Sequence, residues 1–124
     1  MSQSYASAFV NKLISDFQKG EKYTSYNKLK EFVENNPEDE NANYNFAVMS
    51  EQLNKNNLAK KYYNKIIKKN PKHWKSALNL YLIFIKEKEY EKALPLVNSV
   101  LSVKTNYQPA LRDKAIILYF LKKP

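Results

Sequence analysis

A repeat with a period of about 34 residues constrains the fold of this chain more than any other feature of its sequence. Pro37 and Pro71 lie one such period apart, and two asparagines precede the first proline where Lys69 and Asn70 precede the second. The same shift aligns Ala59 with Ala93. A period of this length is typical of proteins built by stacking one small supersecondary unit, because such a unit buries its apolar face only against its neighbours.

The period divides the chain into three units and a remainder, which are residues 6–39, 40–73, 74–107 and 108–123. Within each unit, apolar residues follow helical spacing in two segments that a polar break separates. In the second unit Ala59, Tyr62, Tyr63 and Ile66 stand at i, i+3, i+4 and i+7. The pattern predicts a single all-α domain over residues 1–124, made of three antiparallel helical hairpins and a C-terminal helix that begins a fourth.

Two residues predict local backbone features. Gly20 lies between the two helices of the first unit, where a left-handed backbone is easiest for glycine. Pro95 lies inside the predicted second helix of the third unit, and its missing N–H should delay the start of that helix or kink it.

The units resemble the tetratricopeptide repeat (TPR) family, whose repeating pattern has small residues at positions 8 and 20, apolar ones at 24 and 27, and proline at 32. The second unit matches with Ala47, Ala59, Tyr63, Ile66 and Pro71. Leu13 and Tyr81 depart from the pattern, because position 8 is normally small and the packing there must change. The resemblance implies an α-solenoid whose first helices line a concave groove.

By the same resemblance, the groove is lined by positions 2, 5, 6, 9, 12 and 13 of each unit. The predicted partner-binding residues are Val10, Asn11, Ile14, Tyr44, Asn45, Val48, Lys75, Leu78, Asn79, Leu82 and Lys86. The asparagines fall at position 6, and their amides can donate to and accept from a peptide backbone. Two structural alternatives stay open: the asparagines make local hydrogen bonds, and the apolar residues pack between repeats.

These features predict a protein-interaction scaffold or adaptor that binds an extended segment of a partner protein in the groove. Lys75 and Lys86 would attract acidic residues of such a partner. The alternative is that the chain is the N-terminal repeat arm of a larger enzyme, such as a transferase, and recruits its substrate or mediates oligomerisation. The last helix is apolar all round, so Ile116, Ile117, Tyr119 and Phe120 are expected to form either a homodimer interface or the surface on which further repeats continue.

Other function classes lack their usual residues. The chain has no cysteine, one histidine and one glycine, which leaves no thiolate nucleophile, no His-partnered constellation and no glycine-rich phosphate loop. We therefore expect no enzymatic activity, no cofactor and no metal site. The net charge of +9 comes mostly from lysine, which lacks the planar fork of arginine, so no specific nucleic-acid binding is expected. The absence of cysteine and of a long apolar run predicts a cytoplasmic location away from membranes.

Overall fold

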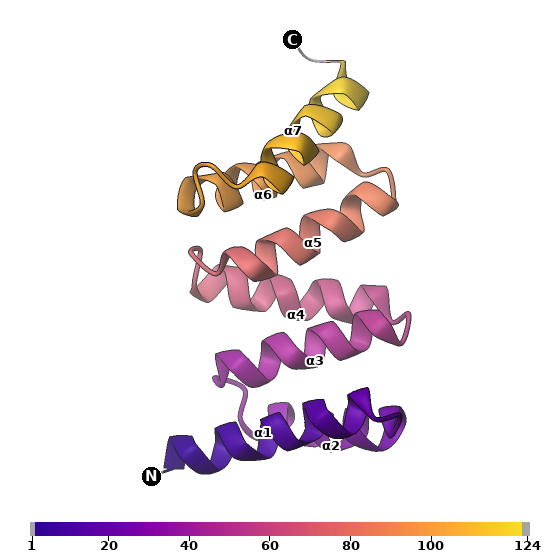
Figure 1. The fold of residues 1–124 in the computed structure, drawn as a ribbon, viewed down its shortest axis with the longest axis vertical. Helices are drawn as coiled ribbons and strands as arrows, with labels where there is room; N and C mark the ends of the chain where they lie inside the picture. The colour runs from indigo at the N-terminus through magenta and orange to yellow at the C-terminus, as the bar shows by residue number, and fades with distance from the viewer. Residues whose placement is uncertain (1, 123–124) are drawn as a thin grey trace. The chain divides into compact units, whose positions relative to one another are not determined.

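The computed structural model describes residues 2–122, with the backbone alone for residues 2–4, and all of the regular structure in this range is helical (Figure 1). The helices are α1 (Ser2–Gln18), α2 (Lys22–Asn35), α3 (Glu40–Gln52), α4 (Asn56–Lys69), α5 (Trp74–Lys86), α6 (Tyr90–Val103) and α7 (Gln108–Leu121). Residues 123–124, which include the last residue of the predicted 108–123 helix, lie outside the described residues. The predicted all-α fold of helical hairpins is confirmed.

The helix boundaries repeat with the period seen in the sequence. First helices begin at residues 40, 74 and 108, and second helices begin at residues 22, 56 and 90, so each step equals one sequence repeat. The one departure is α1, which begins at Ser2 instead of residue 6. None of the described helices is long and apolar enough to cross a membrane.

Side chains immediately before α3 and α5 fix where these two helices begin. Asp39 Oδ1 accepts a hydrogen bond from the backbone N–H of Ala42 at 3.0 Å, and His73 Nδ1 accepts one from the N–H of Ser76 at 3.2 Å. Both acceptors satisfy amides that have no partner inside their helix. The lone histidine of the chain therefore caps a helix.

A residue with a left-handed backbone follows the end of each of the helices α1, α3, α5 and α7. Gly20 has φ 112°, and the equivalent residue of each later repeat also has positive φ: Asn54 at 62°, Lys88 at 60° and Lys122 at 54°. The conformation predicted for Gly20 is thus present at all four equivalent positions, although only the first carries glycine.

Pro95 lies in the second turn of α6, and the expectation of a delayed start is wrong. The helix begins at Tyr90, and the Glu89 carbonyl accepts the N–H groups of both Lys92 and Ala93. Because these bonds lie before the proline, its missing N–H removes only the later bond to the carbonyl of residue 91. The buried side chains of Ala93 and Val97 hold this segment in the helix.

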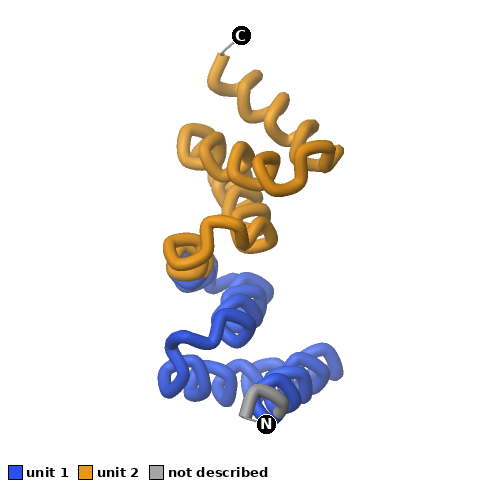
Figure 2. Tube along the Cα trace, turned by 90° about the vertical axis from the view of Figure 1, so that its left-hand side faces the viewer, with its two compact units in different colours: residues 1–62 blue, residues 63–124 orange. Residues whose placement is uncertain are grey.

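Figure 2 shows the two compact units of the chain, residues 1–62 and 63–124, with their boundary inside α4. In unit 1, α2 packs against both α1 and α3. The buried core of unit 1 consists of Val10, Leu13, Phe17, Tyr26, Leu29, Val33, Ala42, Phe46 and Met49. The rings of Tyr26 and Phe46 stack with their centroids 5.0 Å apart, which joins α2 to α3.

In unit 2, α6 packs against both α5 and α7. The buried core of unit 2 consists of Ala77, Tyr81, Ala93, Val97, Val100, Ala110 and Ile117. Tyr81, which stands where the TPR pattern has a small residue, is fully buried, and its hydroxyl donates to Asp113 Oδ2 at 2.7 Å. Burial first, and then this hydrogen bond, raise the pKa of the Tyr81 phenol far above its usual range.

Candidate functional site

Two matched rows of side chains on α1 and α3 form the candidate site in unit 1. On α1 the row runs at i, i+4, i+7 and i+11, and on α3 it recurs one repeat later. The two rows are Ser7, Asn11, Ile14 and Gln18, and Asn41, Asn45, Val48 and Gln52. At 3.6 residues per turn each row occupies one helix face. We call the surface between the two rows the α1/α3 furrow.

The furrow contains two pockets. The first has a volume of about 120 Å³ and is lined by Ile14, Phe17, Gln18, Asn45, Val48, Met49 and Gln52. The second has a volume of about 400 Å³ and is lined by Ala6, Ser7, Asp39, Glu40 and Asn41. Because early residues of both helices line one pocket and later residues line the other, α1 and α3 run in the same direction, as Figure 1 also shows.

The smaller pocket has an apolar floor and an amide rim. Phe17 and Met49 form the floor, and each is 3% exposed. The half-buried side chains of Ile14 and Val48 form its walls. The amide side chains of Gln18, Asn45 and Gln52 also line the pocket. The pocket could therefore take an apolar side chain of a ligand while these amides contact the ligand's backbone.

Of the predicted groove residues in unit 1, Ile14, Asn45 and Val48 line the smaller pocket. Asn11 lies in the α1 row and is exposed, although it lines neither furrow pocket. The prediction for Val10 is wrong, because this residue is 1% exposed and belongs to the core. It precedes Asn11 by about 100° around the helix, which turns it away from the furrow. Tyr44 is half-buried and lines neither pocket.

The position-6 side chains do not form one uniform row. Asn45 Nδ2 donates to the carbonyl oxygen and to Oδ1 of Asn41, at 2.9 and 3.1 Å. Asn79 Nδ2 instead donates to the hydroxyl of Tyr63 at 3.2 Å, from α5 to α4. The Asn45 bonds are local, as the structural alternative expected, whereas the Asn79 bond joins two helices.

The predicted groove residues of unit 2 lie on α5. Leu78 is half-buried against the core, Leu82 is 40% exposed, and Lys75 and Lys86 are exposed. The ammonium of Lys75 lies 5.9 Å from the ring centroid of Trp74. The attraction of acidic partner residues by these two lysines stays a prediction.

The apolar residues predicted to form a contact surface on α7 divide into two groups. Ile116, Tyr119 and Phe120 are 40%, 75% and 52% exposed, and the Phe120 ring stacks on Tyr90 with centroids 4.7 Å apart. Ile117 is fully buried in the unit 2 core, so its inclusion in that surface is wrong. Its side chain packs in the core to which α5, α6 and α7 all contribute.

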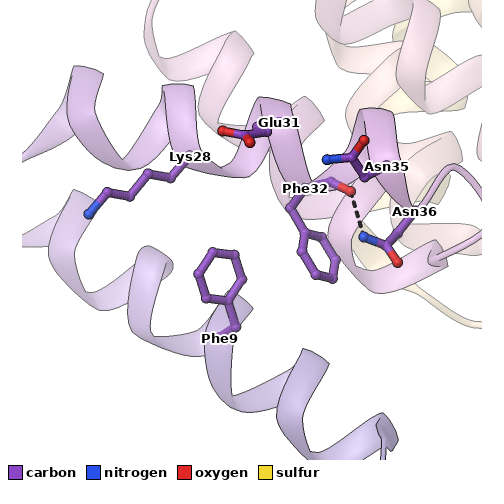
Figure 3. Close-up of a pocket in the computed structure, with 6 residues that line it drawn as sticks. All are labelled: Phe9, Lys28, Glu31, Phe32, Asn35 and Asn36. Carbon is purple, nitrogen blue, oxygen red and sulfur yellow. Dashed lines mark hydrogen bonds between the residues drawn. The ribbon is translucent and has the colours of Figure 1, made fainter.

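A further pocket, of about 230 Å³, lies between α1 and α2 (Figure 3). The rings of Phe9 and Phe32 form its apolar side, with centroids 5.3 Å apart. Asn36 Nδ2 donates to the Phe32 carbonyl at 3.0 Å, and Lys28 and Glu31 stand at the rim. The rim carries both signs of charge and so indicates no particular ligand.

Sequence reasoning omitted Ser7, Gln18, Asn41 and Gln52, which complete the furrow. The TPR resemblance contains the signal that could have found them, because they occupy positions 2 and 13 of their units. Among the described residues, no cluster of three or more histidine, cysteine, aspartate or glutamate side chains could hold a metal ion.

No protein-family model and no curated protein matches this chain. Solved structures of MamA do match it. A double mutant of MamA from strain RS-1 superposes with a TM-score of 0.85 at 19% identity, over 95% of this chain and 66% of the other. A MamA fragment from Desulfovibrio magneticus RS-1 gives 0.82 at 19% identity, over 93% and 65%. MamA from strain AMB-1 gives 0.84 at 15% identity, over 93% and 63%.

This chain therefore spans slightly less than two thirds of the MamA chains that it matches. Because the sequence identity is below 20%, the similarity to these structures shows the fold alone. The chain has the TPR-like helical repeat fold of MamA.

Proposed function

We propose that this protein is a protein-interaction scaffold, not an enzyme, and that it holds an extended segment of a partner protein in the α1/α3 furrow. The observation that carries the proposal is the pair of matched rows, in which the same polar–amide–apolar–amide order occurs on two neighbouring helices. The repeat puts like chemistry on both sides of the furrow, so a segment lying along it could contact both helices in the same way.

The furrow combines the two contributions that peptide recognition needs. Burial of an apolar side chain against Phe17 and Met49 supplies affinity, at about 25 cal/mol for each Å² removed from water. Amide side chains on the rim supply hydrogen bonds that are independent of the ligand's sequence. Asn45 could serve in this way, because its hydrogen bonds to Asn41 use the nitrogen and leave Oδ1 as an acceptor for a peptide N–H.

The test is panning of a peptide display library against the wild type and against Ile14→Glu/Val48→Glu, which places two carboxylates in the smaller pocket. Val103→Glu is the matched control, because Val103 is 39% exposed at the end of α6 and lies outside the furrow. Circular dichroism establishes that all three proteins are folded.

We expect the wild type and Val103→Glu to enrich the same peptide class and the double variant to lose it. Asn11→Ala/Asn45→Ala should weaken binding of the selected peptides without changing which apolar residue they share. Enrichment that survives in Ile14→Glu/Val48→Glu would exclude the furrow as the binding site.

A further inference from the structure

A row of apolar side chains on α7 faces solvent. Leu111, Ala115 and Tyr119 stand at i, i+4 and i+8, so they share one face of the helix. Leu111 is 41% exposed, Tyr119 is 75% exposed, and Ala115 between them is also exposed. We call these three residues the α7 row. The helices that the structure describes leave this row largely uncovered.

The repeat shows what covers the same row on α5. The residues one period before the α7 row are Ala77, Tyr81 and Ile85. Ala77 and Tyr81 are 1% and 0% exposed, and they share the unit 2 core with Ala93 and Val97 of α6. Ile85 packs against the same core. In unit 2, therefore, the second helix of a hairpin covers this row.

The first hairpin shows the same arrangement. Leu13 and Phe17 of α1 stand three periods before Ala115 and Tyr119, and each is 3% exposed. Both belong to the unit 1 core, to which α2 contributes Tyr26, Leu29 and Val33. The α7 row is thus the face that takes an antiparallel helix with an apolar row of its own.

The α7 row itself has the pattern that it needs in a partner helix. Ala115 is a small residue at the centre, with Leu111 four positions before it and Tyr119 four positions after it. At about 1.5 Å per residue, these two larger side chains lie about 6 Å from Ala115 in opposite directions along the helix. If two such helices pack antiparallel with Ala115 at the crossing point, Leu111 of each faces Tyr119 of the other. A contact of this kind is self-complementary and closes with twofold symmetry.

We propose that a second copy of this chain covers the α7 row, in a twofold-symmetric dimer in which α7 packs antiparallel against α7 of the other copy. The two Ala115 residues meet at the crossing point, with a Leu111–Tyr119 contact on either side. The dimer surface is independent of the α1/α3 furrow. It is also narrower than the surface expected from the sequence, because Ile116 corresponds to Leu82 of the predicted groove and Phe120 already stacks on Tyr90.

Area and charge predict that this dimer is weak. A helix of 14 residues is about 21 Å long and about 10 Å wide, so the contact falls well short of the roughly 800 Å² that each partner of a standard interface buries. The row carries no charged side chain, and the net charge of +9 on each copy opposes association. We therefore expect a dissociation constant of the order of 100 μM, and tighter association at higher salt.

The first measurement is the mass of the full chain by analytical ultracentrifugation, at protein concentrations from about 10 to about 1,000 μM, a range that brackets this expected constant. Tyr119→Lys places a charge in the row. Tyr23→Lys is the matched control, because it makes the same substitution at a tyrosine of α2 that is 63% exposed. Circular dichroism establishes that both variants are folded.

The second measurement tests the crossing point. The chain has no cysteine, so Ala115→Cys gives each copy a single thiol. In the proposed dimer the two thiols lie together, and added diamide takes up their two electrons and two protons as the disulfide forms. Thr105→Cys is the control, since this exposed residue lies in the turn between α6 and α7.

We expect the wild type and Tyr23→Lys to dimerise equally. Tyr119→Lys should weaken the dimer by at least about tenfold, because each dimer loses two buried aromatic contacts. Raising the salt concentration from about 50 to about 500 mM should tighten the wild-type dimer by about twofold to fivefold. Ala115→Cys should cross-link into a covalent dimer, and Thr105→Cys should stay monomeric.

A wild type that stays monomeric at every concentration would overturn this inference, as would a dimer that Tyr119→Lys leaves intact or that Ala115→Cys does not cross-link. A dimer that weakens with salt would indicate a charge-paired interface elsewhere and would also refute it. A labelled peptide of residues 89–107, which contains α6, tests the other occupant. Binding of this peptide to a monomeric wild type, lost in Tyr119→Lys, would assign the row to a helix of another polypeptide and exclude the second copy.

Discussion

Removing the Tyr81 hydroxyl should show how much the hydrogen bond between α5 and α7 contributes to the free energy of unfolding. Tyr81→Phe keeps the buried ring and deletes only the bond to Asp113 Oδ2, which is 2.7 Å long. A hydrogen bond to a charged group contributes about 1.5 to 3 kcal/mol. Asp113 is half-buried, and water can hydrate it in the variant, so we expect a loss of about 1.5 kcal/mol.

Urea unfolding, followed by circular dichroism, gives the free energy for the wild type, Tyr81→Phe, Asp113→Ala and the double variant. The double-mutant cycle isolates the pair, and we expect a coupling energy of about 1 kcal/mol. A coupling below about 0.3 kcal/mol would show that the bond does not stabilise the fold.

The same pair predicts a pH dependence. Because the folded state raises the pKa of Tyr81, its stabilising effect is complete below the unfolded pKa of about 10 and is lost as the pH rises towards the folded value. Linkage predicts that the wild type loses about 1 kcal/mol more than Tyr81→Phe between pH 10 and pH 11. The other nine tyrosines are common to both proteins, so the difference reports Tyr81 alone. A difference that stays constant from pH 8 to pH 11 would refute this reasoning.

Three further substitutions test packing and backbone geometry by the same unfolding measurement. Leu29→Ala should destabilise the protein by about 3 kcal/mol, because Leu29 is 0% exposed and leaves a cavity between helices. A value below about 1 kcal/mol would mean that the core collapses around it. Ser76→Ala should stabilise by about 0.5 to 1 kcal/mol, since the buried Ser76 hydroxyl has no hydrogen-bond partner among the described residues; a loss of stability would reveal one. Pro95→Ala should stabilise by about 1 to 3 kcal/mol, because Pro95 is exposed and alanine restores one helical hydrogen bond; no gain would indicate that the bond cannot form.

The periodic spacing of apolar residues was enough to predict the helices. Ala59, Ala93 and their equivalents recur once in every repeat, and so do the helix starts, because packing of one hairpin on the next imposes the same period on sequence and backbone. At the starts of α3 and α5 a side-chain acceptor adds to this period, and the capping role of Asp39 follows from its residue type alone.

The site was only partly predictable. Position in the repeat fixes the helix face, which is why the predicted residues Ile14 and Val48 line one pocket, while their role in binding stays a prediction. Val10 was misplaced because adjacent positions point about 100° apart and only the core shows which one is buried. The Tyr81–Asp113 bond joins residues 32 positions apart. No local sequence pattern predicts this pair, because the bond depends on the distance between α5 and α7, and the large Tyr81 side chain between them affects that distance.

The left-handed residues at the helix ends make this chain suitable for modular engineering. Lys122 after α7 has nearly the same φ as Asn54 and Lys88, each of which leads into a second helix. A designed copy of residues 89–107 joined after Lys122 would therefore start with the geometry that the chain already uses. Glycine at the join would relieve the strain that lysine bears there. Arrays of chosen length could then be designed by joining copies of one repeat with this single substitution at each join.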